Sequence, residues 1–205
     1  MSRPRCLGLG ACLALSLTAM ACGSGGSSAW DQARIGDTGT NWWLNIRKGA
    51  YFFSVQLRPS YTESATVRSM VVSFAQTVVG KLTSGSPAPA TLVPGLSELP
   101  GPTGWTLDPD QVETANGVAT ASNEIDATTL IDGGAAPFFV AGSYSATGLA
   151  WERWANVDYL MDLKVWQMVS AADATKLYGD LLNNPLYSNI TWTTCSGAAG
   201  ANPCP

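Results

Sequence analysis

The sequence predicts an α+β fold: an antiparallel sheet with helices packed on one face. Two strand-like runs carry this prediction, Tyr51–Arg58 and Asn156–Met168, because apolar and polar residues alternate along both. Each run precedes a stretch with apolar residues at helical spacing, Tyr61–Leu82 in the first case and Ala171–Leu182 in the second. The order strand, strand, helix therefore occurs twice, which predicts two pseudo-repeated halves that share one sheet.

The composition supports one globular domain. At 205 residues, with 46% hydrophobic and 13% charged side chains, the chain can bury a core that offsets the entropy of ordering it. We assign residues 30–205 to this domain, with halves 41–82 and 105–194 joined by a Pro/Gly-rich linker, 83–104. The formal charge of −4 and the lack of any basic run exclude nucleic-acid binding.

The first residues, 1–21, have the form of an export signal peptide. Arg3 and Arg5 give a positive start, and Leu7–Met20 is an apolar run too short to span a bilayer stably. We therefore expect this segment to be absent from the folded protein.

The residues that follow predict a lipid anchor. Ala19–Cys22 resembles the cleavage box of bacterial lipoproteins, in which the cysteine, here Cys22, is acylated. Residues 22–29 then form a flexible tether, rich in Gly and Ser. We predict a protein of the bacterial cell envelope, anchored through its lipid, and Gly23 favours the outer membrane. The alternative is cleavage by the ordinary signal peptidase, which would release a secreted protein.

Export also explains the remaining cysteines. Cys195 and Cys204 are left as a pair in an oxidising compartment, so we expect a disulfide that clamps the C-terminal tail. The chain has no histidine, which is the commonest zinc ligand and the usual general base of Ser and Cys hydrolases. We expect no metal site and no cofactor.

The first half predicts a hairpin followed by a helix. Trp42–Ile46 and Tyr51–Arg58 are joined by a polar turn in which Gly49 suits a positive φ. Ser60 and Glu63 have the spacing of a capping box that would start the helix Tyr61–Leu82, whose apolar stripe we expect to pack on the hairpin.

The linker and the residues after it show no clear periodicity. Thr83–Gly104 has five prolines and four glycines, which is typical of a surface loop. Asp108, Asp110 and Glu113 are close in sequence, but they lack the full ligand set of a calcium loop, so a solvated turn is the better interpretation.

The second half predicts a short helix, three strands and a second capped helix. The short helix is Glu124–Ile131, ended by Asp132 and two glycines, and the final helix begins at a capping box of Ser170 with Asp173 and ends before Pro185. The predicted strands are Phe138–Ser143, Leu149–Trp154 and Asn156–Met168.

Several of these residues resemble an uncharacterised domain family of exported bacterial proteins. The resemblance rests on the sequence Ile-Asp-Gly-Gly-Ala at residues 131–135, on the strand that ends near Met168, and on Asp173-Ala174 before Tyr178. Arg47–Phe52 is similar to the other half of that domain. The order of the halves is reversed here, which would correspond to a circular permutation bridged by Thr83–Gly104. The family has no established activity, so the resemblance implies the fold and export but no catalytic residue.

The leading functional hypothesis is a non-catalytic binding or structural module with an envelope protein or a glycan as its partner. It rests on tryptophans at strand positions, which can stack on sugars or anchor a protein. The candidate ligand-binding residues are Trp42, Trp43, Trp151 and Trp154. The competing interpretation is that these indoles fill the core.

The alternative hypothesis is a glycosidase-like hydrolase with paired carboxylates. Glu152, Asp158 and Asp162 are the only acids clustered on predicted strands, and we place Asp158 and Asp162 beside Lys164 on the solvated face. No nucleophile elbow, phosphate loop or dinucleotide fingerprint occurs in the sequence. Asp132 is interpreted as part of a helix-ending turn. The sequence therefore names no catalytic residue.

Overall fold

The computed structural model describes residues 29–60, 64–82, 85–108, 119–121, 145–183, 188–196 and 204. The strands are β1 Gln32–Asp37, β2 Trp42–Lys48, β3 Tyr51–Pro59, β4 Thr106–Leu107, β5 Ala119–Ala121, β6 Ala146–Ala155, β7 Tyr159–Met168 and β8 Thr191–Thr194. The helical elements are α1 Ser64–Gly80, α2 Pro89–Leu92, the 3-10 turn η1 Leu96–Glu98 and α5 Ala171–Leu182. The described part of the chain is therefore α+β, as predicted.

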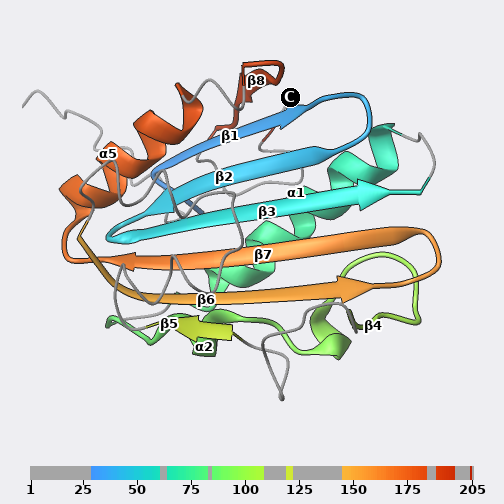
Figure 1. Ribbon diagram of the computed structural model, residues 1–205, viewed down its shortest axis with the longest axis horizontal. Coiled ribbons are helices and arrows are strands. Elements are labelled where there is room, and N and C mark those ends of the chain that lie inside the picture. Colours follow the sequence, from blue (N-terminus) through green and yellow to red (C-terminus); the bar gives the residue numbers. More distant parts are fainter. Residues whose placement is uncertain are drawn as a thin grey trace, which may run out of the picture.

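The described strands form one antiparallel sheet (Figure 1). Its order is β4-β6-β7-β3-β2-β1-β8, and β5 also pairs with β6. The predicted β2–β3 hairpin is confirmed: Lys48 pairs with Tyr51, and Gly49 has a φ of 56° in the turn between them. Two strands next to the hairpin were not predicted, β1 beside β2 and β8 beside β1.

The two faces of the sheet carry different side chains because residues alternate along each strand. Phe53 and Val55 of β3 lie beside Val165 and Leu163 of β7 on one face, which we call the α1 face. Phe52 of β3 and Trp166 of β7 lie beside each other on the opposite face, which we call the α5 face.

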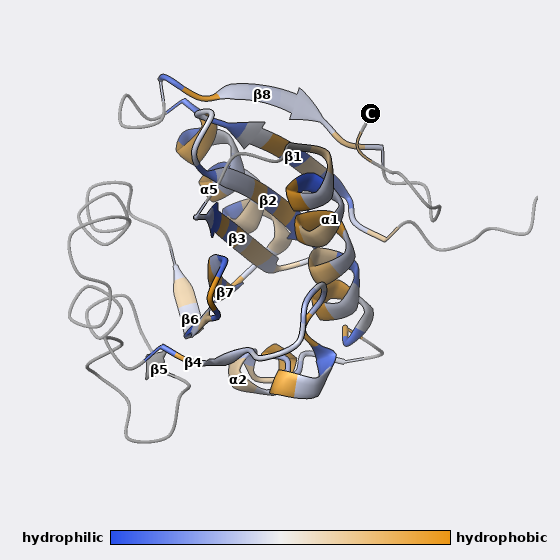
Figure 2. Cartoon of the chain, turned by 90° about the vertical axis from the view of Figure 1, so that its right-hand side faces the viewer, coloured by the Kyte–Doolittle hydropathy of each residue, from blue (hydrophilic) through white to orange (hydrophobic). Residues whose placement is uncertain are grey.

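The helices cover opposite faces of the sheet, so the prediction that both lie on one face is wrong (Figure 2). Helix α1 buries Val67, Val71 and Phe74 in the larger core on the α1 face. Helix α5 packs its apolar stripe on the α5 face, in a second cluster that contains Phe52, Leu149, Trp166, Met168, Ala174, Leu177, Tyr178 and Leu181. Because the helices lie on opposite sides, the two strand-strand-helix halves are not related by a simple repeat, and the pseudo-repeat is not confirmed.

Part of the segment predicted as a linker, Thr83–Gly104, packs against the core. Leu92 of α2 is 1% exposed, and Val93 and Leu99 are partly buried against the same core. Lys81, at the end of α1, donates to Glu98 of η1 at 2.7 Å and ties the segment to the helix. The proline-rich composition hid these apolar anchors because they follow no period.

The strand predicted as Asn156–Met168 begins only at Tyr159. Asn156 Oδ1 accepts hydrogen bonds from the backbone N–H groups of Asp158 at 2.9 Å and Tyr159 at 2.8 Å, which makes an Asx turn between β6 and β7. Val157 is 91% exposed in this turn. The prediction that Val157 belongs to the apolar face of the strand is therefore wrong.

Two predicted structural devices are confirmed. Ser170 Oγ accepts from the backbone N–H of Asp173 at 3.1 Å and caps α5. Cys195 and Cys204 form a disulfide between buried side chains, and the N–H of Cys195 donates to Ala33 of β1 at 2.9 Å. The bridge closes a short loop and contributes about 2–3 kcal/mol by chain entropy.

Several predictions lie outside the described residues. They are the signal peptide and Cys22, Glu63 of the first capping box, the short helix Glu124–Ile131, the strand Phe138–Ser143, and the Ile-Asp-Gly-Gly-Ala sequence with Asp132. In the described part of the chain, no helix is both long and apolar enough to cross a membrane.

Candidate ligand-binding site

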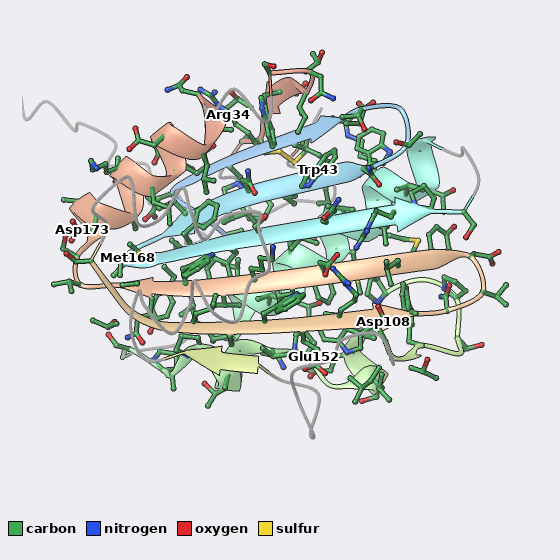
Figure 3. All side chains as sticks on the ribbon, in the orientation of Figure 1. Arg34, Trp43, Asp108, Glu152, Met168 and Asp173 are labelled. Atoms are coloured by element: carbon green, nitrogen blue, oxygen red, sulfur yellow. A yellow bond between two sulfur atoms is a disulfide. The ribbon has the colours of Figure 1, made fainter. Side chains whose placement is uncertain are left out.

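A pocket lies on the α5 face, beside the end of α5. It is lined by Trp43, Asn45, Phe52, Ser54, Gln56, Asp162, Lys164, Trp166, Leu181 and Trp192. Trp43, on β2, is labelled in Figure 3, where α5 covers the other end of this face. The floor of the pocket is therefore sheet, and Leu181 of α5 contributes to one wall.

The register of the strands aligns the polar groups of the pocket. Ser54 of β3 pairs with Lys164 of β7 on one side and with Asn45 of β2 on the other. Neighbouring strands lie roughly 5 Å apart, so this row of three side chains spans roughly 10 Å. Gln56 and Trp43 are paired in the next row on the same face.

Two residues that line the pocket each have a buried polar atom with no hydrogen-bond partner among the described residues. Asn45 is 5% exposed, and its Oδ1 is an unpaired acceptor. Trp192 Nε1 is an unpaired donor. Buried polar atoms are nearly always paired, because an unpaired one costs about 1–3 kcal/mol. An acceptor and a donor left open in one pocket match a ligand that both donates and accepts hydrogen bonds.

Because Gly36 has no side chain, it leaves space for Trp192, which lines one side of the pocket. A Cβ on Gly36 would lie 2.4 Å from Ile190 Cγ2, 2.9 Å from Trp192 Cε3 and 3.1 Å from the backbone oxygen of Thr191. The φ of Gly36 is not positive, so the constraint is space and not backbone conformation. Glycine lets the side chains of Ile190 and Trp192 pack closely against β1, the strand that pairs with β8.

Replacing Gly36 with alanine is expected to lower the free energy of unfolding by about 1–3 kcal/mol, because β8 must move to admit the new methyl group. Urea unfolding measures this change. Gly179→Ala is the control: its Cβ would meet nothing within 4 Å, so alanine in α5 should instead stabilise the protein by up to about 1 kcal/mol. Equal stabilities for both variants would contradict the packing argument.

A charged cluster borders the pocket, and Asp162 is its centre. Asp162 is 3% exposed and accepts from Arg58 Nη2 at 2.7 Å and Arg153 Nε at 2.6 Å. Trp151 Nε1 also donates to it, at 3.3 Å. The prediction that Asp162 lies on a solvated face is wrong, because side chains from β3 and β6 close over it. We call Arg58, Arg153, Asp162 and Trp151 the charged cluster.

Lys164 stands beside this cluster. Its Nζ lies 5.7 Å from the centroid of the Trp151 ring, and Arg153 Cζ lies 5.4 Å from the same centroid. Burial lowers the pKa of Lys164; Asp162 opposes this effect, while Arg153 and Arg58 add to it. The ammonium group is therefore held among other cations in a largely desolvated place.

The three acids of the hydrolase hypothesis do not meet. Glu152 pairs with Leu163 and so points to the α1 face, whereas Asp162 points to the α5 face. Asp158 lies in the β6–β7 turn and not on a strand. Glycosidases need two carboxyl groups on either side of one bond, and these three acids do not provide that geometry. Burial raises the pKa of Glu152 to about 7, but this side chain is buried in the core and does not line the pocket.

The four candidate tryptophans divide between the two faces. Trp43 lines the pocket and Trp151 belongs to the charged cluster. Trp154 is 1% exposed and packs edge-on against Phe74 of α1, with ring centroids 5.6 Å apart. Trp42 is partly buried against the same core. Trp154 is therefore a core residue, and Trp42 lies on the core side of the sheet, so neither lines the pocket.

Sequence reasoning missed most of the pocket, namely Asn45, Ser54, Gln56, Lys164 and Trp192. One signal was present: Ser54, Gln56 and Arg58 alternate with apolar residues on β3, a strand long enough to be central. A row of polar residues in the middle of a sheet is unusual unless something covers or uses it.

The described residues do not bring together the ligands of a metal site. Within the described ranges, no three Asp, Glu or Cys residues lie close enough to hold an ion. Compared with family models, with curated proteins and with solved structures, the chain matches none of them. Inference about function therefore depends on the pocket and on the sequence.

Proposed function

We propose that this protein is a cell-envelope lipoprotein, anchored through Cys22, that binds a carbohydrate in the pocket on the α5 face. The apolar leader, the Ala19–Cys22 box and the Gly/Ser tether support the anchor, and the disulfide is consistent with an oxidising compartment. Mass spectrometry of the mature chain checks for acyl groups that Cys22→Ala would remove.

The observation that carries the binding proposal is the unpaired Oδ1 of Asn45. The side chain is almost fully buried, yet no described residue uses this acceptor. A group kept only for stability would be apolar or paired here. Residues that serve binding often lower stability in this way, because the ligand provides the missing partner.

The chemistry of the pocket favours a carbohydrate over a purely apolar ligand. A sugar hydroxyl can donate to Asn45 Oδ1 and accept from Trp192 Nε1, the two atoms left unpaired. Trp43 and Trp192 offer flat apolar surfaces for the C–H face of a ring, while Ser54 and Gln56 add polar groups on β3, the strand next to Trp43.

The test is to replace Asn45 with leucine, which has a similar size but no acceptor. We expect affinity for the sugars that bind to fall at least about tenfold, because one hydrogen bond in a desolvated pocket is lost. We expect the free energy of unfolding to stay the same or rise. Isothermal titration calorimetry with glucose, galactose and N-acetylglucosamine and their oligomers measures binding, and urea unfolding measures stability.

The control is Asn189→Ala, at an exposed asparagine outside the pocket; it should leave both binding and stability unchanged. A marked loss of stability in Asn45→Leu would show that Asn45 has a structural role. Absence of binding by the unmodified protein to every sugar tested, neutral or acidic, would overturn the proposed function.

A further inference from the structure

The surroundings of the pocket are richer in cations than the chain as a whole. The full chain has a formal charge of −4. At the edge of the pocket, however, Arg58, Arg153 and Lys164 meet only two described carboxylates, those of Asp162 and Asp108. Among the described residues, the local balance is three positive charges against two negative ones.

Asp162 is already fully used by the two arginines. Its Oδ2 accepts from Arg58 and its Oδ1 accepts from both Arg153 and Trp151. Asp108 lies 3.8 Å from Arg153 Nε and is not among the residues that line the pocket. Neither carboxylate therefore neutralises Lys164 by direct contact.

Of these three cations, Lys164 is the one without a carboxylate partner among the described residues. No described carboxylate lies within the 4.0 Å of its Nζ that defines an ion pair, although its side chain lines the pocket. Its nearest charged neighbours along the sheet are Asp162, two residues away on β7, and Arg153 on β6. Across the pocket, on the side of β3 and β2, it faces Ser54 and Asn45, which are neutral.

Resting on the proposed function, we propose that the carbohydrate is acidic: a saccharide whose carboxylate pairs with Lys164 Nζ while a hydroxyl of the same ring reaches Asn45 Oδ1. Ser54 lies between these two anchors, so the ring would sit over β3. A partly desolvated ion pair of this kind is stronger than one at the surface. The lowered pKa of Lys164 is consistent with a place that gains from an incoming anion.

Matched sugar pairs test the charge directly. The unmodified protein is titrated with glucuronate and glucose, galacturonate and galactose, and N-acetylmuramic acid and N-acetylglucosamine. We expect at least one acid to bind about tenfold or more tightly than its neutral partner, with a preference that shrinks as salt is added. Lys164→Met should make the acid and its neutral partner bind alike.

Lys164→Arg is the second variant, because it keeps the charge and should keep a preference for the acid. Circular dichroism and urea unfolding verify that both variants fold. Equal binding of the members of every pair by the unmodified protein would overturn the acidic ligand but leave carbohydrate binding standing. A preference that persists in Lys164→Met would assign recognition of the acid to another group. Binding of no sugar at all would remove both proposals.

Discussion

Replacing Asp162 with asparagine is expected to lower the free energy of unfolding by about 3 kcal/mol, because Arg58 and Arg153 would remain side by side without their shared counter-charge. Asp162 lies between the two guanidinium groups, at 2.7 and 2.6 Å, and its side chain is 4% exposed. The arginines are 35% and 25% exposed. Water can partly solvate the two arginines. The expected loss of stability is therefore at the lower end of the range for removing one partner of a buried ion pair.

The position of Asp162 in the sheet explains why this loss should be global. Arg58 belongs to β3 and Arg153 to β6, the two neighbours of β7. The carboxylate therefore joins three adjacent strands through side chains, in addition to the backbone ladder. We expect the unfolding transition of Asp162→Asn to remain cooperative but to occur at lower urea concentration.

Asp158→Asn is the matched control, since it removes a carboxylate four residues earlier, in the β6–β7 turn, where no described ion pair involves the side chain. It should change stability by no more than about 0.5 kcal/mol. If the two variants unfold at the same urea concentration, the charged cluster does not contribute to stability in the way argued here.

The core of the fold was predictable because its elements are long and periodic. Strands β3 and β7 and helices α1 and α5 each show enough turns or alternations for the pattern to exceed chance. Strands β1 and β8 were missed because Gln32–Asp37 contains only two buried hydrophobic residues and Thr191–Thr194 none. Strands of this kind are held by pairing and by the disulfide, neither of which leaves a local pattern.

The side on which α5 packs was mispredicted for a physical reason. Alternation assigns one face of a strand to the core and the other to water. At one end of the sheet, Phe52, Trp166 and Met168 make the second face apolar as well. Trp166 was visible on that face in the sequence, but a single indole could not show that a helix covers it.

The binding site was only partly predictable, because its parts come from distant segments. Aromatic excess pointed to Trp43, which does line the pocket. The contact between Gly36 and Trp192 joins residues from β1 and β8, and nothing near Gly36 in sequence signals it. Asn45 gave no signal either, since an asparagine within a strand looks like any solvated residue until its partners are known.

Glu152 should make the protein less stable as pH rises from about 4.5 to about 7. Burial raises its pKa from 4.5 to about 7 in the folded state. Within this interval the folded protein holds the proton and the unfolded chain releases it, so folding is favoured at the acidic end. The stabilisation is complete below pH 4.5 and lost above about 7, and the interval corresponds to about 3 kcal/mol.

Urea unfolding at pH 4.5, 6 and 8 measures this dependence in the unmodified protein and in Glu152→Gln. The glutamine side chain cannot ionise, so the free energy of unfolding of the variant should fall much less between pH 4.5 and 7. At pH 8 the variant should be more stable than the unmodified protein. Glu98→Gln is the control. The pKa of Glu98 is lowered, chiefly by its hydrogen bond with Lys81. Glu98 therefore stabilises the folded protein above its unfolded pKa, and this stabilisation is lost only as pH falls. Removing Glu98 should therefore leave the decline between pH 4.5 and 7 in place. A decline of the same size in Glu152→Gln would mean that another group is responsible, and that Glu152 does not carry the proton that its burial on the α1 face requires.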